Sequence, residues 1–131
     1  MASLVLSLDQ TSFDCNDLGS NTVRLTVTDA SGNTDQCTAT VTINDVTPPT
    51  AVCQNITVNL DATGNATITA ADIDDGSSDG CGGAVTLAAS KTSFTCADLG
   101  ANTVTLTVTD ASGNTDQCTA TVTINDVTPP T

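Results

Sequence analysis

The chain has 131 residues and a formal net charge of −13 at pH 7, because 15 Asp residues face only two basic residues, Arg24 and Lys91. This charge repels phosphate backbones and anionic membrane surfaces, which argues against nucleic-acid binding and membrane association. His, Glu and Tyr are absent, so most side chains that perform general acid–base catalysis are missing. We therefore expect no enzyme and, without a long apolar run, no membrane insertion.

An 81-residue period organises the sequence. Residues 11–50 align without a gap with residues 92–131, and only four of these 40 positions differ. Near-identical tandem units are typical of extended arrays, in which each unit adds length or a weak binding surface. We interpret residues 1–50 as the C-terminal half of a preceding repeat that ends in a Pro-Pro linker. Residues 51–131 are then one complete repeat with its own linker.

Apolar and polar side chains alternate with a period of two along most of the complete repeat, as in half-buried antiparallel strands. A turn is predicted at 61–64, one short helical turn at 70–75, another turn at 99–102 and a hairpin loop at 110–114. Strands are predicted over residues 53–60, 65–70, 84–89, 103–109 and 119–125. So many short strands predict an all-β fold, a small immunoglobulin-like antiparallel β-sandwich in tandem repeat, with Phe94 in a thin core.

Four cysteines in the complete repeat favour disulfides in an oxidising compartment. Zinc is the competing interpretation, but the sequence has no CxxC pair and no His. In such sandwiches the first and last strands run parallel from the same pole, and Cys53 and Cys118 open these two strands. We therefore predict a Cys53–Cys118 bond, which leaves Cys81–Cys96 by elimination.

The half repeat has two cysteines, Cys15 and Cys37, without their usual partners, so we expect them to be reduced, bonded to each other, or bonded wrongly. Its strand edges are unpaired, so we expect residues 3–50 to be disordered, to pair with a neighbouring chain, or to dock on the complete repeat. Pro48 and Pro49 predict a short, stiff linker and hence a rod-like array.

Three groups of oxygen-bearing side chains are candidates for calcium, which prefers six to eight hard oxygen ligands. One lies in a Gly-bearing loop, one precedes the linkers, and one lies in the hairpin loop. The members are Asp72, Asp74, Asp75 and Asp79; Asn44, Asp45, Asn125 and Asp126; and Asp110, Asn114 and Asp116. Calcium would balance the negative charge. The alternative is that these are solvated turn residues with local hydrogen bonds.

Rows of Thr alternate with the apolar residues, for example in residues 103–109. Such rows occur on ice-binding surfaces, and hydroxyl groups also meet sugars. The alternative is that Thr is simply a soluble, β-branched choice for the outer face of a strand.

Several motifs resemble the hyalin repeat (HYR) family. They are Pro48-Pro49 followed by Cys53-x-x-Ile56-Thr57-Val58, the Asp-Gly-Cys-Gly of residues 79–82, and residues 107–114 and 118–122. The resemblance covers the whole complete repeat, with departures at Gln54, Leu106 and Ala120. It implies an immunoglobulin-like sandwich linked to cell adhesion, and no specific ligand. The Thr-rich, aromatic-poor sequence looks like the repeat arrays of cell-surface adhesins in gliding bacteria.

We expect a structural and adhesive repeat in the stalk of a secreted, extracellular cell-surface adhesin. Its expected partners are the neighbouring repeats and extracellular polysaccharide or solid surfaces. The alternative is a carbohydrate-binding β-sandwich module of an extracellular protein.

Overall fold

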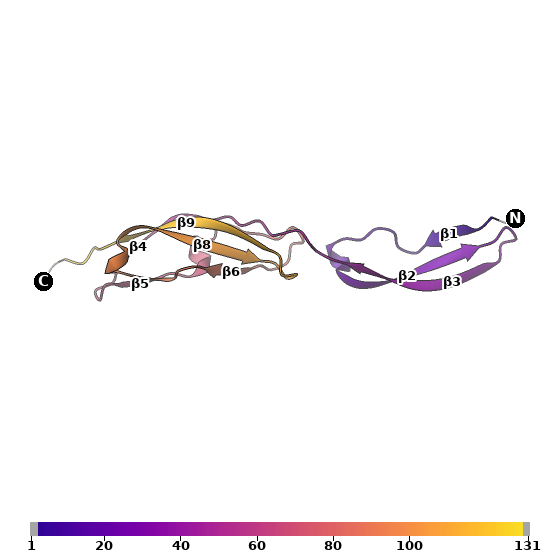
Figure 1. Ribbon diagram of the computed structural model, residues 1–131, viewed down its shortest axis with the longest axis horizontal. Helices are drawn as coiled ribbons and strands as arrows, with labels where there is room; N and C mark the ends of the chain where they lie inside the picture. Colours follow the sequence, from indigo (N-terminus) through magenta and orange to yellow (C-terminus); the bar gives the residue numbers. More distant parts are fainter. Residues whose placement is uncertain (1–2, 130–131) are drawn as a thin grey trace. The chain divides into compact units, whose positions relative to one another are not determined.

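The computed structural model describes residues 3–129, and the chain divides into two compact units, of which the first ends at Asp45 and the second begins at Val46 (Figure 1). The predicted all-β class is confirmed. The helical elements among the described residues are three short 3-10 turns: η1 (Cys15–Asp17), η2 (Ala70–Ile73) and η3 (Cys96–Asp98). Across residues 3–129, no helix has the length and apolar character needed to cross a bilayer.

The second unit is a small β-sandwich. A four-stranded sheet has the order β4-β9-β8-β6, and a two-stranded sheet pairs β5 with β7. The strands are β4 (Ile56–Asn59), β5 (Asn65–Thr67), β6 (Thr86–Ala89), β7 (Ser93–Thr95), β8 (Gly100–Thr109) and β9 (Thr115–Asn125). Strands β8 and β9 form a long antiparallel hairpin, and β4 runs parallel to β9. The first and last strands therefore start at the same pole, as predicted.

The alternating sequence pattern places one face of the hairpin in the core. Val104, Leu106, Val108, Val122 and Ile124 are each at most 1% exposed. Two further large side chains are fully buried, Phe94 of β7 and Ile73 of η2. Burying one such side chain contributes about 1.5–3 kcal/mol, so this cluster is the main source of stability for the unit.

Some predicted boundaries differ from the observed ones. The predicted strand at 65–70 ends early, because Thr69 begins a capping box in which its N–H donates to the Asp72 carboxylate over 2.8 Å. The predicted turn at 99–102 is the start of β8. There Gly100 has a φ of 98°, a conformation that glycine adopts at low cost. Strand β7 is too short to show a period in the sequence.

The first unit contains one three-stranded sheet, with the order β1-β2-β3. Its strands are β1 (Val5–Leu8), β2 (Gly19–Thr28) and β3 (Thr34–Ile43). The register matches that of β6, β8 and β9 with a shift of 81 residues: Val5 pairs with Thr28 as Thr86 pairs with Thr109. The half repeat thus forms the same three-stranded arrangement as the corresponding part of the complete repeat.

Candidate functional site

Asp110 anchors the hairpin loop between β8 and β9. Its Oδ1 accepts hydrogen bonds from the N–H groups of Ser112 at 2.9 Å and Asn114 at 2.8 Å, and its Oδ2 accepts one from Asn114 Nδ2 at 3.0 Å. Gly113, with a φ of 88°, completes the turn. Asp followed by small and turn-forming residues folds locally in this way, because the carboxylate replaces a backbone acceptor. The Asp110 side chain is buried, with 5% of its surface exposed.

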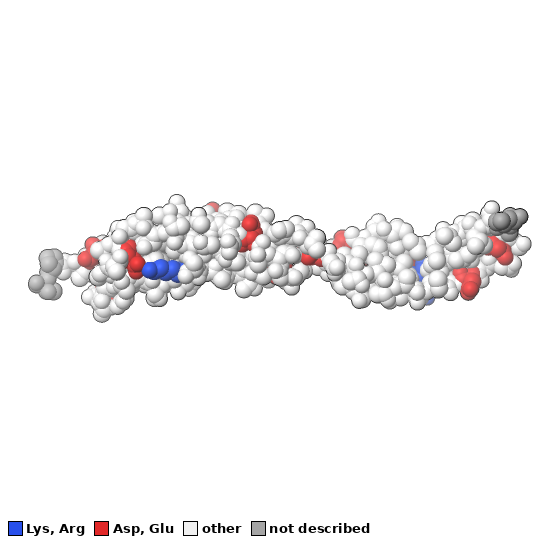
Figure 2. Space-filling model, in the orientation of Figure 1, with Lys and Arg blue, Asp and Glu red and all other residues white. Residues whose placement is uncertain are grey.

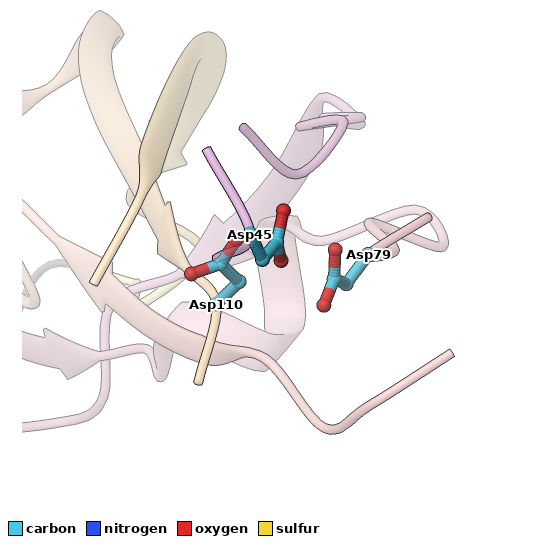
Figure 3. Close-up of side chains that lie close together, drawn as sticks. All are labelled: Asp45, Asp79 and Asp110. Carbon is cyan, nitrogen blue, oxygen red and sulfur yellow. The ribbon is translucent and has the colours of Figure 1, made fainter. Parts of the chain in front are cut away.

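Asp79 comes close to Asp110, although 31 residues separate them in the sequence. Asp79 lies in the loop that follows η2, where its carbonyl accepts the N–H of Gly82 at 2.9 Å. A carboxylate oxygen of Asp79 lies within 4.8 Å of one of Asp110 (Figure 3). Two carboxylates at this distance repel each other and are a suitable part of a site for a hard divalent cation.

The other carboxylates of the predicted 72–79 loop do not join this pair. The Asp72 carboxylate caps η2, and Asp74 Oδ1 accepts the N–H of Ser77 at 3.0 Å. Asp75 is exposed. Within residues 3–129, these three and Asp79 do not form a group close enough to share one ion. For Asp72 and Asp74, the structure shows the local hydrogen bonds of the alternative interpretation.

The remaining candidates occupy ends of strands. Asp116 Oδ2 accepts the N–H of Ala51 at 2.9 Å, which ties the start of the complete repeat to β9. The carbonyl of Asn125 accepts the N–H of Leu60 at 2.8 Å, and Asp126 Oδ1 accepts that of Thr128 at 3.0 Å. Asn44 and Asp45 follow β3 at the end of the first unit. Calcium binding at these linker positions stays a prediction, and residues 130–131 of the second linker lie outside the described residues.

One predicted disulfide is confirmed and the other is wrong. Cys53 and Cys118 are bonded, with their Cα atoms 5.9 Å apart. Cys96 is a free, exposed thiol, whereas Cys81 is disulfide-bonded to another residue.

The two cysteines lie at opposite ends of the sandwich. Cys96 packs beside the turn at Gly64, where an added Cβ would lie 3.0 Å from its Sγ. Cys81 follows Asp79, which lies near the Asp110 end of the long hairpin. Strand β9 has 11 residues, and at about 3.3 Å per residue it separates these ends by roughly 30 Å. That distance is several times the reach of a disulfide.

A shallow hollow lies at the Cys96 end of the second unit. It is lined by Asp61, Ala62, Thr63, Gly64, Cys96, Asp126, Thr128 and Pro129. Two carboxylates and two hydroxyl groups line it, but no aromatic ring does. This lining offers hydrogen bonds to a polar ligand and no stacking platform for a sugar ring.

The surface carries few charged groups outside the loops. Figure 2 shows acidic side chains in small separate areas and most of the visible face uncharged. Lys91 Nζ lies 2.8 Å from Asp98 Oδ1 and 5.4 Å from the centroid of the Phe94 ring. With one Lys and one Arg in the whole sequence, the protein has no basic patch that could bind phosphate groups.

The fold and the site define a small, disulfide-bonded, all-β repeat domain of the kind found outside cells. Residues 44–124 match the profile of the HYR domain, and the chain belongs to the HYR domain family. The resemblance found in the sequence motifs is thereby confirmed at the level of the family. HYR domains are extracellular domains of the adhesion type.

A curated relative is hyalin from Strongylocentrotus purpuratus, which is 38% identical over 138 residues. The match covers 100% of this chain, and the chain spans 11% of the length of that relative. A solved structure described as "PcdhgB3 EC1-4 in 50 mM HEPES" aligns with 95% of this chain and 41% of its own, with a TM-score of 0.43 and 13% identity. A likeness at this level supports neither a shared fold nor a shared function.

Proposed function

We propose that this chain is a structural and adhesive repeat in the stalk of a cell-surface adhesin. The observation that carries the proposal is the 81-residue period, whose two copies form sheets of identical register in both units. A catalytic site needs one asymmetric arrangement of side chains, whereas repeated, nearly identical sandwiches supply length and many weak contacts. The disulfide and the Pro-Pro linkers support rigidity in an oxidising, extracellular setting.

Small-angle X-ray scattering of chains with two, three and four copies of the 81-residue period tests the stalk. We expect the maximum dimension to grow by an equal step with each added copy, because stiff linkers hold successive sandwiches in an extended array. A matched series with Pro48→Gly and Pro49→Ser at each linker should grow more slowly. Growth that is the same in both series, or that follows the square root of the copy number, would contradict the proposal.

The alternative function is binding of polysaccharide, and the polar hollow beside Cys96 is the feature that favours it. A glycan array probed with the oxidised chain separates the two functions. A spacer gives no saturable signal, whereas a binding module gives one that weakens when Thr63 and Asp126 are replaced by Ala. Thr63→Ala alters the turn at Asp61, so Asp126→Ala alone provides the cleaner comparison.

We extend the proposal to surface adhesins of gliding bacteria, on the ground of the Thr-rich, aromatic-poor sequence. Replacing the repeat array of such an adhesin by copies of this 81-residue unit tests the extension. Restored surface attachment and gliding would support it. Display of the chimaera on the cell surface without either activity would contradict it.

We also propose that a calcium ion stabilises the second unit at the Asp79–Asp110 pair. The buried carboxylate of Asp110 and its neighbour Asp79 support this proposal, since a cation between them would remove their mutual repulsion. The net charge of −13 also attracts cations to the chain. Carbonyl groups and water would complete the coordination that calcium requires.

Thermal unfolding of the oxidised chain in millimolar calcium and in excess chelator measures this effect. We expect calcium to raise the unfolding temperature of the chain by several degrees, since a ligand that binds only the folded state stabilises it. Asp79→Asn should remove most of the rise. The matched control is Asp75→Asn, an exposed Asp of the same loop. A rise of equal size in both variants would place the ion elsewhere, and no rise in the parent chain would contradict calcium binding.

A further inference from the structure

The sheet of the first unit leaves an apolar face open. Val23, like its equivalent Val104, is buried, with 3% of its surface exposed. Several other residues that are fully buried in the second unit are partly or wholly exposed at the equivalent positions of the first. Leu106 and Val108 are 0% exposed, whereas Leu25 and Val27 are half-buried. Ala120 is 1% exposed, and Ala39 is exposed. The open face consists of Leu4, Leu6, Leu8, Leu25, Val27, Ala39, Val41 and Ile43.

Strand β1 shows the same contrast on this face. Val85, Leu87 and Ala89 pack against the core of the second unit. At the positions 81 residues earlier, Leu4, Leu6 and Leu8 have 62, 63 and 50% of their surface exposed. Side chains of this size rarely stand together in water on a monomeric domain, and a contiguous group of them indicates a binding surface.

In the second unit, the equivalent face of the sheet is covered by side chains from an earlier part of the chain. Leu60, Ala66, Ile68 and Ile73 belong to its buried core, and Ile56 and Val58 of β4 pack against that core. All of them lie within residues 51–75. This segment adds β4 to the free edge of β9 in parallel register, with Ile56 opposite Val122 and Val58 opposite Ile124.

The polar groups that hold this segment on β9 all have equivalents on β3 or directly after it. Thr121 donates its N–H to Asn55 Oδ1 at 2.8 Å, Asp116 Oδ2 accepts the N–H of Ala51, and the Asn125 carbonyl accepts that of Leu60. The equivalent residues of the first unit are Thr40, Asp35 and Asn44, because residues 25–50 repeat residues 106–131 without a difference. Strand β3 is an edge strand in its sheet, so this row of partners is available.

The first unit also has a cysteine at the position equivalent to Cys118. Cys118 is bonded to Cys53 of the covering segment, and Cys37, its equivalent, is free and exposed. We propose that the first unit is an acceptor for the N-terminal half of an HYR repeat, a segment built like residues 51–75. That segment adds a parallel strand to β3, covers the open face, and bonds its cysteine to Cys37. The inference rests on the equivalence of the two sheets and does not depend on the proposed stalk function.

The disulfide forms by thiol–disulfide exchange. The partner cysteine enters as a mixed disulfide with a low-molecular-weight thiol of the glutathione class. The Cys37 thiolate attacks the sulfur of the partner cysteine, the bond to the small thiol breaks, and the small thiol leaves with the proton that Cys37 gave up. One disulfide is lost and one is formed, so the step needs no further oxidant.

A peptide of residues 51–75, with its only cysteine, Cys53, carried as the glutathione mixed disulfide, tests the proposal on the full chain. Mass spectrometry under non-reducing conditions measures the rates at which Cys37 and Cys96 acquire the peptide. Both thiols are free and exposed in the same molecule, so Cys96 is the internal control. We expect Cys37 to react at least about tenfold faster, because docking raises the local concentration of the peptide.

A second peptide, with Ile56→Asp and Val58→Asp, is the matched control. It should react with Cys37 no faster than with Cys96, since it cannot cover an apolar face. Noncovalent binding provides an independent readout. A labelled Cys53→Ser peptide should bind the chain saturably, and the charged version should not. Equal rates at the two thiols with the first peptide, or a dimer of the chain that buries the open face and excludes the peptide, would overturn the proposal.

Discussion

Asp29 and Asp110 each organise the hairpin loop that they begin. Both accept the N–H groups two and four residues ahead and the amide of the Asn four residues ahead, with distances between 2.8 and 3.1 Å. The hydrogen bonds from Asn33 lower the pKa of Asp29 below its ordinary value. The turn is the same in both units although Asp110 is buried and Asp29 is half-buried, so five local residues are sufficient to form it.

Asp98 is the residue from which a pH dependence follows. Lys91 donates to its Oδ1 and Thr95 donates its N–H to its Oδ2, both at 2.8 Å, and these hydrogen bonds, that of Lys91 first, lower the pKa of Asp98. A carboxylate with a lowered pKa in the folded state stabilises it above the ordinary Asp pKa of about 3.9. This contribution is lost as the pH falls through the folded pKa.

We therefore expect Asp98→Asn to lower the unfolding temperature at pH 7, and the difference from the parent chain to shrink below about pH 4. Thermal unfolding followed by circular dichroism between pH 2 and pH 7 measures it. Asp75→Asn, which changes an exposed carboxylate, is the control and should leave the unfolding temperature nearly unchanged at pH 7. A difference that stays constant down to pH 2 would show that Asp98 acts through its shape and not through its charge.

At the scale of elements, pairing decides which segments become strands. Ser93, Phe94 and Thr95 form β7 because β5 lies opposite them, and Ala66 pairs with Phe94. The same tripeptide positions in the first unit, residues 12–14, are not a strand, and that unit has no counterpart of β5 among its described residues. Three residues are too few to show a period of two, so the sequence alone does not predict β7.

The Cys53–Cys118 bond joins the first strand region to the last. Its two cysteines are 65 residues apart in the sequence, and closing a loop of that length contributes about 4 kcal/mol in the chain-entropy account. This bond was predictable because both cysteines directly precede apolar alternation and parallel outer strands begin at one pole. The Cys81–Cys96 prediction was wrong. It had no strand direction to support it and depended on where two loops lie, which the sequence does not show.

At the scale of the whole molecule, a comparison of the two units shows how much a second layer contributes to the burial of the same sheet. The strands β2 and β8 share nearly all of their residues, yet only β8 lies in a complete sandwich. Leu25 and Leu106 have the same sequence neighbours downstream and pair with Cys37 and Cys118 in the same way. The main difference between their surroundings is the second layer of the sandwich, which residues 51–75 and Phe94 of β7 supply in the second unit.

We expect Leu106→Ala to reduce the free energy of unfolding of the second unit by about 2–5 kcal/mol, the usual cost of removing a fully buried Leu. Leu25→Ala should reduce that of the first unit by less than half as much. Amide hydrogen exchange followed by NMR measures each unit separately, which a single unfolding curve of a two-unit chain does not. Equal losses would mean that the first unit buries Leu25 as fully as the second buries Leu106.

The sequence by itself determined the strands with a period of two, the loops at 61–64 and 110–114, and the Cys53–Cys118 bond. These depend on neighbours along the chain or on one strand direction, so their physical causes are visible in short segments. Only the tertiary structure decided that Asp79 meets Asp110 while Asp72 and Asp74 turn to backbone N–H groups, and that Cys96 stays free. Those outcomes depend on which loops reach the same end of the sandwich. That placement results from the packing of Phe94, Ile73 and the long hairpin around one core, and packing between distant segments leaves no periodic signal in the sequence.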